Sequence, residues 1–380
     1  MKPMVHSIFP IGDSGGPQRL LSEASARGAI RVVMGPRICE TCGRESPHLT
    51  CHNRPDPSTP KECGGKTASA RRRRSGSRRK GERTSVNLAP ILEVKRRGLG
   101  LDNLPEKIKA VKGLMSEGQT PEPLEKGILR AKHGVSVFRD GTARFDMSDV
   151  PVTHFRPVEI GTSWKKLVKM GYTHDVRGNE ISSDGQLIEL FPQDFIPSRL
   201  SAEHLLNTCS FVDDLLVRFY GMEPFYRTDA ADGLVGHIAI GLAPHTSGGV
   251  ACRIIGWTDA SAGYAHPLFH AAKRRNCDGD EDSIMMLMDG LLNFSQSILP
   301  ANRGGRMDAP LVLTTRLNPS EIDKEALNVD CAWVYSREFY EKTLSQPHSK
   351  EAKGIVDLVE NRLGTIGEIR GYGCTHDSGY

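Results

Sequence analysis

The segment HAAKRRNCDGDEDS, residues 270–283, has the residue types of a phosphate or metal site. Within ten residues it carries three cations, Lys273, Arg274 and Arg275, and then four carboxylates, Asp278, Asp280, Glu281 and Asp282. Two carboxylates about 5 Å apart repel each other by roughly 3 kcal/mol at the effective dielectric of a protein surface. A bound cation, the neighbouring basic side chains or solvation must therefore offset this repulsion.

Two structural interpretations need no catalytic metal. In the first, the acids precede an apolar helix at 283–299 and favour the positive end of its dipole. In the second, an EF-hand loop starts at Asp278. That loop has Ser283 where its sixth position requires glycine, and Asp289 in place of the bidentate glutamate.

A third interpretation takes the segment as extended. Asp278, Asp280 and Asp282 would then project from one face, with Asn276 in phase. Gly279 would let a bulky ligand approach, and carboxylates are preferred ligands of Mg²⁺, which also binds substrate phosphates. Spacing alone leaves this phosphoryl-transfer site, acid capping and plain solvation all open.

The elements that must position this segment are of mixed α+β type, without an internal repeat. Apolar periodicity and end signals predict helices at 17–30, 104–115, 121–132, 163–171, 202–221, 283–299 and 351–364. Strands are expected within 5–16, 248–260 and 309–317, and a hairpin at 134–146 around Asp140-Gly141. Lys126, Arg130 and Lys132 recur at helical spacing, which predicts either a nucleic-acid-facing stripe or a solvated helix face.

Composition limits the class of protein. The 380 residues suffice for two or three domains, and no run of eighteen apolar residues is long enough to span a membrane. The N-terminus lacks the pattern of a signal peptide, and nine cysteines indicate reduced thiols or metal ligands, so we expect a cytoplasmic protein. Residues 1–97 hold 20 Lys and Arg against 8 Asp and Glu, whereas the remainder holds 30 against 38. This asymmetry predicts that the first part faces a polyanion.

Several long motifs carry a family resemblance. PLFHAAKRRNCDGDED, LMDGLLNFSQSILPANRGGRMDAPLVLTTRL and GLAPHTSGG resemble the large subunit of the archaeal family D DNA polymerase, also called archaeal DNA polymerase II. MKPMVHSIFPIG, TPEPLEKGILRAKHGVSVFRDGTARFD, VTHFRPVEIG, LVKMGYTHD and FVDDLLVRFYG extend the similarity to nearly the whole chain outside 37–85.

The resemblance implies a polymerase core built from two double-psi β-barrels. Its Asn-x-Asp-Gly-Asp motif maps onto Asn276, Asp278 and Asp280 as ligands of catalytic Mg²⁺, with Asp282 as a companion. The implied reaction is attack of a primer 3′-hydroxyl on a deoxynucleoside triphosphate. The implied partners are DNA, the remainder of the large subunit, and a small subunit associated with 3′–5′ exonuclease proofreading.

The same resemblance predicts the organisation of the chain. We expect 1–36 to end the first barrel region, 37–66 to form a zinc-ribbon-like module, 67–85 to be an Arg-rich linker, and 86–380 to form the catalytic core with the second barrel. Family members are much longer, so the isolated chain is expected to have little polymerase activity. The alternative is a non-catalytic DNA-binding or assembly fragment that retains the metal ligands.

The cysteine-rich stretch departs from the repeated Cys-x-x-Cys pairs of the family. Cys39, Cys42, Cys51 and Cys63 could still close one tetrahedral Zn²⁺ site, with His48 and His52 as substitute ligands, and a metal-free loop is the alternative. The basic run 71–80 would bind nucleic acid by counterion release, or is a solvated linker.

A last group of side chains could bind phosphate or nucleic acid. The candidates are Lys273, Arg274, Arg275, Arg303, Arg306 and His270. The competing interpretation is a solvated charged surface for the basic side chains. His245, His266 and His270 are either functional or structural hydrogen-bonding residues.

Overall fold

The computed structural model describes residues 4–35, 37–44, 46, 50–51, 63–69, 83–300, 302, 304–307, 309–315 and 324–365. It divides into two compact units. The first comprises Met1–Arg144, Asn207–Arg227 and Met288–Arg306, and the second comprises Phe145–Leu206, Thr228–Leu287 and Met307–Tyr380.

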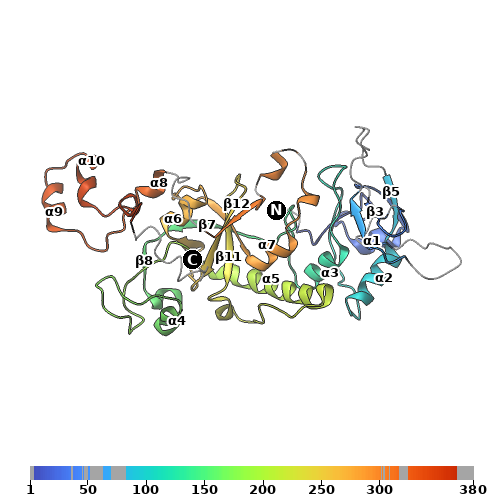
Figure 1. The fold of residues 1–380 in the computed structure, drawn as a ribbon, viewed down its shortest axis with the longest axis horizontal. Coiled ribbons are helices and arrows are strands. Elements are labelled where there is room, and N and C mark those ends of the chain that lie inside the picture. The colour runs from blue at the N-terminus through green and yellow to red at the C-terminus, as the bar shows by residue number, and fades with distance from the viewer. Residues whose placement is uncertain are drawn as a thin grey trace. The chain divides into compact units, whose positions relative to one another are not determined.

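A closed β-barrel forms the centre of the second unit (Figure 1). Its strands are β7 (Phe145–Pro151), β10 (Asp194–Ile196), β11 (Ile238–Leu242), β12 (Gly248–Ile254), β13 (Ala262–Ala265) and β14 (Glu281–Met286). They follow the order β10-β13-β7-β14-β11-β12, and β10 also pairs with β12, which closes the six-stranded ring. β15 (Val312–Thr314) adds to β12 outside this ring. The expectation of a mixed α+β fold is confirmed.

The two-residue period of a strand explains which side chains of β7 are buried. Met147 and Asp149 are buried, whereas Asp146 and Ser148 are exposed, as the two-residue period of a strand requires. Asp282 and Ile284 are the matching buried positions of β14, and antiparallel pairing sets Asp282 opposite Met147. Both buried aspartates therefore lie on one face of the same strand pair.

Short helices and a small two-stranded sheet complete the second unit. The two strands of this antiparallel pair, β8 (His154–Phe155) and β9 (Ile188–Glu189), are connected through α4, and Phe155 and Ile188 contribute to a buried apolar cluster with Tyr172. The helices are α4 (Trp164–Lys169), α6 (Pro267–Ala272), α8 (Lys324–Leu327), α9 (Arg337–Thr343) and α10 (Ser349–Ala352). α5 (Ala202–Leu215) and α7 (Leu287–Asn293) begin in this unit and continue into the first.

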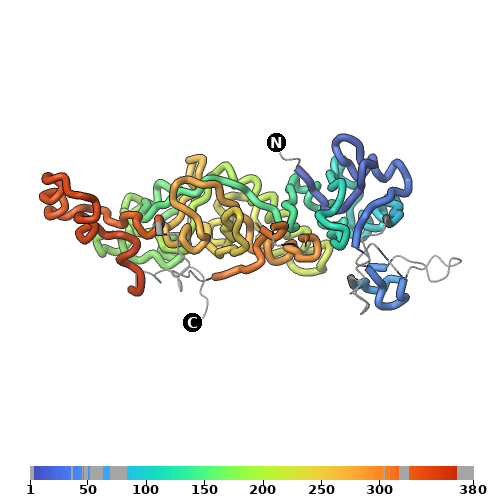
Figure 2. Tube along the Cα trace, turned by 90° about the horizontal axis from the view of Figure 1, so that it is seen from above, coloured from blue at the N-terminus to red at the C-terminus, as the bar shows by residue number. Residues whose placement is uncertain are grey.

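The first unit is built from helices and two-stranded sheets. The strands pair as β1 (Ser7–Pro10) with β6 (Ala110–Val111), β2 (Ala29–Val33) with β5 (Arg83–Asn87), and β3 (Arg37–Cys39) with β4 (Thr67–Ser69). The helices are α1 (Leu21–Ala26), α2 (Leu88–Gly98) and α3 (Leu124–Lys132). Figure 2 traces these segments in blue to teal.

Several expected elements are present. Helices form within 17–30, 121–132, 163–171 and 202–221, and strands form within 5–16, 248–260 and 309–317. The 202–221 helix closes as expected at Gly221, which adopts φ +67°, after a final π-helical turn, Leu216–Tyr220.

Other predictions are wrong. Residues 283–286 belong to β14, so the predicted 283–299 helix begins only at Leu287. No helix forms at 104–115, the hairpin at 134–146 lacks paired strands, and 351–364 contains only short helical turns. Long apolar runs fit a buried strand as well as a buried helix, which explains the error at 283–286.

Both interpretations are wrong for two of the three basic residues of α3, Lys126 and Arg130, whereas Lys132 is exposed. Arg130 is fully buried and Lys126 is nearly so. Arg130 Nη1 donates to Glu122 Oε1 at 2.7 Å and Nη2 donates to the Gly141 carbonyl at 2.7 Å. These guanidinium hydrogen bonds hold the first unit together instead of facing nucleic acid.

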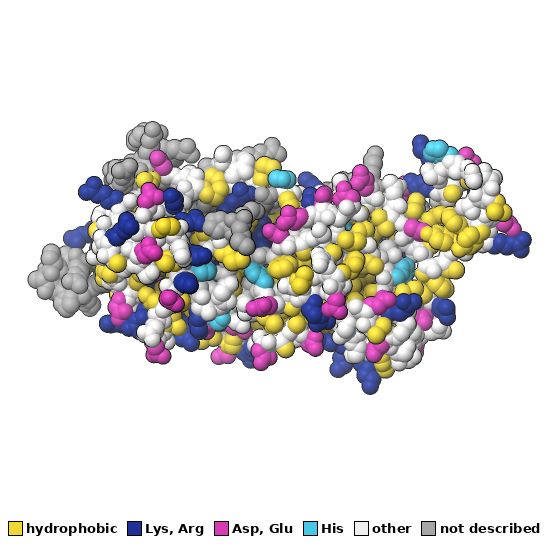
Figure 3. All heavy atoms as spheres, turned by 180° about the vertical axis from the view of Figure 1, so that it is seen from behind, with side chains coloured by type: hydrophobic (Ala, Val, Ile, Leu, Met, Phe, Trp, Pro, Cys, Tyr) yellow, Lys and Arg dark blue, Asp and Glu magenta, His cyan; other side chains and the backbone are white. Residues whose placement is uncertain are grey.

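The surface does not separate its charges on the face drawn in Figure 3, where basic and acidic side chains are interspersed. The basic run 71–80, which accounts for much of the positive charge of residues 1–97, falls outside the described residues. Within the described residues, no helix is both long and apolar enough to cross a membrane.

Candidate metal and nucleotide site

The acidic loop, residues 274–280, connects α6 to β14 on the barrel. Its conformation is irregular, with φ +58° at Arg274 and φ +89° at Gly279. Glycine adopts this left-handed region without steric cost, and a Cβ built on Gly279 meets nothing within 4 Å. The middle of the loop therefore has open space beside its aspartates.

Among the described residues, Asp278, Asp280 and Asp282 do not come together as one group of three carboxylates. The regular strand β14 begins at Glu281, so it covers only the last two residues of the segment that the sequence predicted to be extended. Asp278 is exposed, Asn276 and Asp280 are half-buried, and Asp282 is buried. Two groups of potential metal ligands occur among the described residues, and neither includes Asp278 or Asp280.

Arg275 offsets part of the repulsion between these carboxylates. Its Nη1 lies 3.4 Å from Asp280 Oδ2 and its Nε lies 3.6 Å from Asp282 Oδ1. Its Nη2 also donates to the Glu281 carbonyl at 2.7 Å. A neighbouring cation therefore offsets part of the carboxylate repulsion at Asp280.

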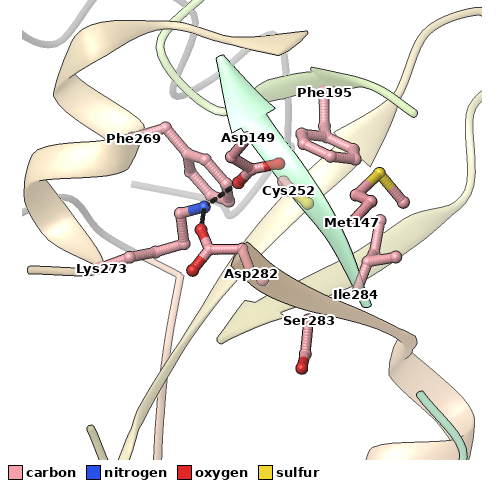
Figure 4. A pocket seen from close by; sticks show the side chains of 10 residues that line it. Met147, Asp149, Phe195, Cys252, Phe269, Lys273, Asp282, Ser283 and Ile284 are labelled. Carbon is pink, nitrogen blue, oxygen red and sulfur yellow. Dashed lines mark hydrogen bonds and ion pairs between the residues drawn. The ribbon is translucent and has the colours of Figure 1, made fainter. Parts of the chain in front are cut away.

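Lys273 provides the second, buried cation. Its Nζ contacts one carboxylate oxygen of Asp149 and one of Asp282, and all three side chains are at most 3% exposed (Figure 4). The three residues line a cavity of about 10 Å³, close to the space that one water molecule needs. Lys273 is thus engaged by protein carboxylates in place of the phosphate that the sequence suggested.

Burial and charge act in opposite directions on the pKa values of this cluster. Burial alone would lower the pKa of Lys273, but Asp149 and Asp282 raise it above the usual value. Burial raises the pKa of Asp149 to about 7, against the attraction of Lys273. The lysine therefore stays charged at neutral pH and stabilises the anionic form of its neighbours.

The other candidate residues differ in burial and in their contacts. His270 and His266 are buried, and burial lowers the pKa of each to about 3, so both are neutral. His266 Nδ1 accepts the Leu268 N–H at the start of α6, which is a structural role. Arg274 is exposed, and Arg306, in the first unit, donates from Nε to the Pro300 carbonyl at 3.2 Å. Arg303 falls outside the described residues.

Four cysteines of the first unit do converge. The Sγ atoms of Cys39 and Cys63 lie 3.7 Å apart, those of Cys42 and Cys51 lie 3.6 Å apart, and all four lie within 4.8 Å of one another. A tetrahedron with Zn–S bonds of about 2.3 Å has sulfur–sulfur edges of about 3.8 Å. These thiols therefore fit a zinc-sized tetrahedral site.

The Cys39 thiol is already prepared for metal binding. The N–H groups of Cys42 and Thr41 each point at its sulfur at 3.4 Å. Hydrogen bonding, chiefly from the Cys42 N–H, lowers the pKa of Cys39 to about 6, which favours the thiolate that metals bind. His48 and His52 fall outside the described residues.

Asp149 is the residue that the sequence analysis missed. It contributes to the second potential ligand group, with His270 and Asp282, and to the contacts of Lys273. A signal was present, because Asp149 stands in phase with Phe145 and Met147 in an alternating strand. A carboxylate at an inward, apolar phase is buried only when something pairs with it.

Comparison with known proteins identifies the family. A family model described as the DNA polymerase II large subunit DP2, catalytic domain, matches residues 101–379. The chain belongs to the DNA polymerase II large-subunit family. A second model, for the central domain of the same subunit, matches residues 1–74 of this family member.

Individual relatives agree with this assignment. DNA polymerase II large subunits of Archaeoglobus fulgidus and Pyrococcus furiosus are each 46% identical over 100% of this chain, which covers 34% and 31% of their own lengths. That of Methanocorpusculum labreanum is 45% identical over 100% of this chain and is covered to 36%. The chain thus spans about a third of the length of the curated relatives that it matches.

Proposed function

We propose that this chain carries the metal-binding part of the nucleotidyl-transfer centre of an archaeal replicative DNA polymerase. The observation that supports this most is the acidic loop itself, an exposed aspartate beside an open glycine on a closed barrel. The substrates would be a DNA primer-template and deoxynucleoside triphosphates. The six-stranded barrel would be the second double-psi barrel of the enzyme.

Asn276, Asp278 and Asp280 would hold Mg²⁺ in this proposal. Their oxygen donors suit a hard cation that takes one or two carboxylates together with substrate phosphates, so a substrate is needed to complete the site. A divalent cation held there would supply charge stabilisation for the primer 3′-hydroxyl and for the departing pyrophosphate. A cation bound at Asp280 Oδ2 would take the place of Arg275 Nη1, which would leave that guanidinium available to a phosphate.

The remaining parts of the proposal concern structure and assembly. The four-cysteine site would bind one structural Zn²⁺ in the module 37–66. The run 71–80, in the linker 67–85, would add sequence-independent DNA affinity. The core 86–380 and the segment 1–36 would assemble with the rest of the large subunit and with a small subunit that proofreads by 3′–5′ exonuclease action.

A second candidate is a non-catalytic DNA-binding or assembly fragment. Neither group of three or more potential metal ligands among the described residues includes Asp278 or Asp280, which favours this alternative. On this alternative the acidic loop carries only surface charge, and synthesis by the complete enzyme would not depend on it.

Primer extension by the complete large subunit assembled with its small subunit separates the two candidates. Asp278→Asn and Asp280→Asn should each reduce synthesis by about 100-fold or more, since several kcal/mol of charge stabilisation are lost. Glu281→Gln, an exposed acid beside the same loop, is the matched control and should retain synthesis. Duplex binding should persist in all three variants. Unchanged synthesis in both aspartate variants would establish the assembly fragment instead.

A further inference from the structure

The buried Lys273 cluster lies at both ends of the acidic loop. Lys273 caps the C-terminus of α6, immediately before the loop, and Asp282 is the second residue of β14, immediately after it. The ion pair between them closes a loop of nine residues in sequence separation. Asp149, on the adjacent strand β7, binds the same ammonium from the other side (Figure 4).

A backbone hydrogen bond also fixes the C-terminal end of the loop, at Asp280. The Asp149 N–H donates to the Asp280 carbonyl at 3.0 Å, which continues the β7–β14 pairing one step into the loop. Asp149 thus holds Lys273 through its side chain and Asp280 through its main chain. One residue of β7 therefore connects the start of the loop to its last aspartate.

The middle of the loop has fewer contacts than its two ends. Asp278 and Gly279 are exposed, and no hydrogen bond or ion pair of the Asp278 side chain is found among the described residues. Ordering a free segment costs conformational entropy, and metal ligands bind best when their supporting residues already hold them in place. The fixed ends supply that order where the middle of the loop lacks it.

We propose that Lys273, Asp149 and Asp282 form an ionic clamp that positions the acidic loop for metal binding. The clamp residues do not touch substrate or metal. They act through Asn276, Asp278 and Asp280, by limiting how far the loop can move between α6 and β14. Lys273 and Asp282 are thereby assigned to positioning and not to phosphate or Mg²⁺.

This inference rests on the proposed function, because it assigns the clamp to the same loop. Lys273→Ala alone would leave the carboxylates of Asp149 and Asp282 buried without a cation. That variant would therefore test stability and not positioning. The informative variant is the triple change Lys273→Met, Asp149→Asn and Asp282→Asn, which removes all three charges and nearly preserves side-chain size. Asp149→Asn alone is the milder companion, since it leaves the Lys273–Asp282 pair in place.

The barrel offers a matched control. Arg253 and Asp194 form another buried pair in the same unit, with Nη2 to Oδ2 at 2.8 Å and Nε to Oδ1 at 3.0 Å. They lie on β12 and β10, outside the acidic loop and its two ends. Arg253→Met with Asp194→Asn removes an equally buried ion pair without touching the clamp.

The first measurement is amide hydrogen exchange of the metal-free complete large subunit. In the triple variant, amides of residues 274–280 should exchange about tenfold faster, while the control pair leaves them unchanged. Asp149→Asn should give a smaller increase in the same peptide. If the loop exchanges at the wild-type rate in both clamp variants, the proposal is wrong.

The second measurement is the Mg²⁺ concentration that gives half-maximal primer extension by the assembled enzyme. The clamp variants should require about tenfold more Mg²⁺, as loss of a supporting residue behind metal ligands does, and the control pair should not. An unchanged Mg²⁺ requirement in the clamp variants, with synthesis abolished by Asp278→Asn, would overturn the clamp and leave the proposed function standing. Full synthesis by Asp278→Asn and Asp280→Asn would instead overturn the function.

Discussion

Replacing Arg130 by methionine should strongly destabilise the first unit, although the sequence suggested a surface residue. Methionine fills much of the same space but donates no hydrogen bond. The guanidinium contacts both carboxylate oxygens of Glu122, at 2.7 and 2.9 Å, and the carbonyls of His6 and Gly141. The side chains of Arg130 and Glu122 are 0% and 5% exposed, so water cannot replace these contacts.

The magnitude follows from the charge that is left behind. Removing one partner of a buried ion pair costs about 3–5 kcal/mol, because the other charge stays buried without compensation. Adding Glu122→Gln removes that charge, while the carbonyl oxygen of the new side-chain amide can still accept the Ile8 N–H that Glu122 accepts at 2.7 Å. The double variant should therefore cost at least about 2 kcal/mol less than the sum of the single variants.

Urea unfolding of the 380-residue chain, followed by circular dichroism, measures these differences through the transition midpoint. Arg97→Met is the control, since Arg97 pairs with Glu93 on the exposed surface of α2 and should change stability by less than about 1 kcal/mol. A loss below about 1 kcal/mol for Arg130→Met, or additive single effects, would refute the buried-pair reasoning.

Three further perturbations test other parts of the structure. Cys42→Ser should lower the bound zinc from one equivalent per chain to well below half, measured by metal analysis after gel filtration, and wild-type protein without zinc would exclude the site. Burial lowers the pKa of His266 to about 3, so its contribution to stability is present above pH 6.5 and is lost as pH falls towards 3. His266→Asn keeps a helix-capping oxygen and should reduce the loss of stability between pH 7 and pH 5 by about 2 kcal/mol, whereas an unchanged acid profile would contradict the assignment. Gly127→Ala would normally favour a helix, but its Cβ would meet Ser7 Cβ at 2.3 Å, so the variant should destabilise the protein by about 1–3 kcal/mol. The control is Gly98→Ala, whose Cβ meets nothing within 4 Å and which should not lower the thermal midpoint.

Local sequence patterns predicted correctly the elements whose apolar period fits a helix or a strand but not both. The helix at 202–221 shows a helical apolar period and a terminal glycine, and its end at Gly221 is confirmed. The cysteines at 39, 42, 51 and 63 were grouped correctly because four thiols in one short stretch are enough for a tetrahedral metal site. In both cases the determining residues are close together in the sequence.

Long-range pairing determined what the sequence could not show. Ile284, Met285 and Met286 fit a buried helix as well as a buried strand, and only the pairing of β14 with β7 and β11 places them in a strand. Arg130 resembles a surface residue until Glu122 and the Gly141 carbonyl are placed beside it. Lys273 likewise resembled a phosphate ligand because Asp149 lies 124 residues away in the sequence.

Anomalous diffraction from crystals of the complete enzyme, soaked with Mn²⁺ and bound to primer-template and a non-hydrolysable nucleotide, tests the central claim directly. We expect an anomalous peak at bonding distance, about 2.1 Å, from carboxylate oxygens of Asp278 and Asp280, with Lys273 still between Asp149 and Asp282. A peak held by Asp149, His270 and Asp282 instead, or none beside the acidic loop, would contradict it.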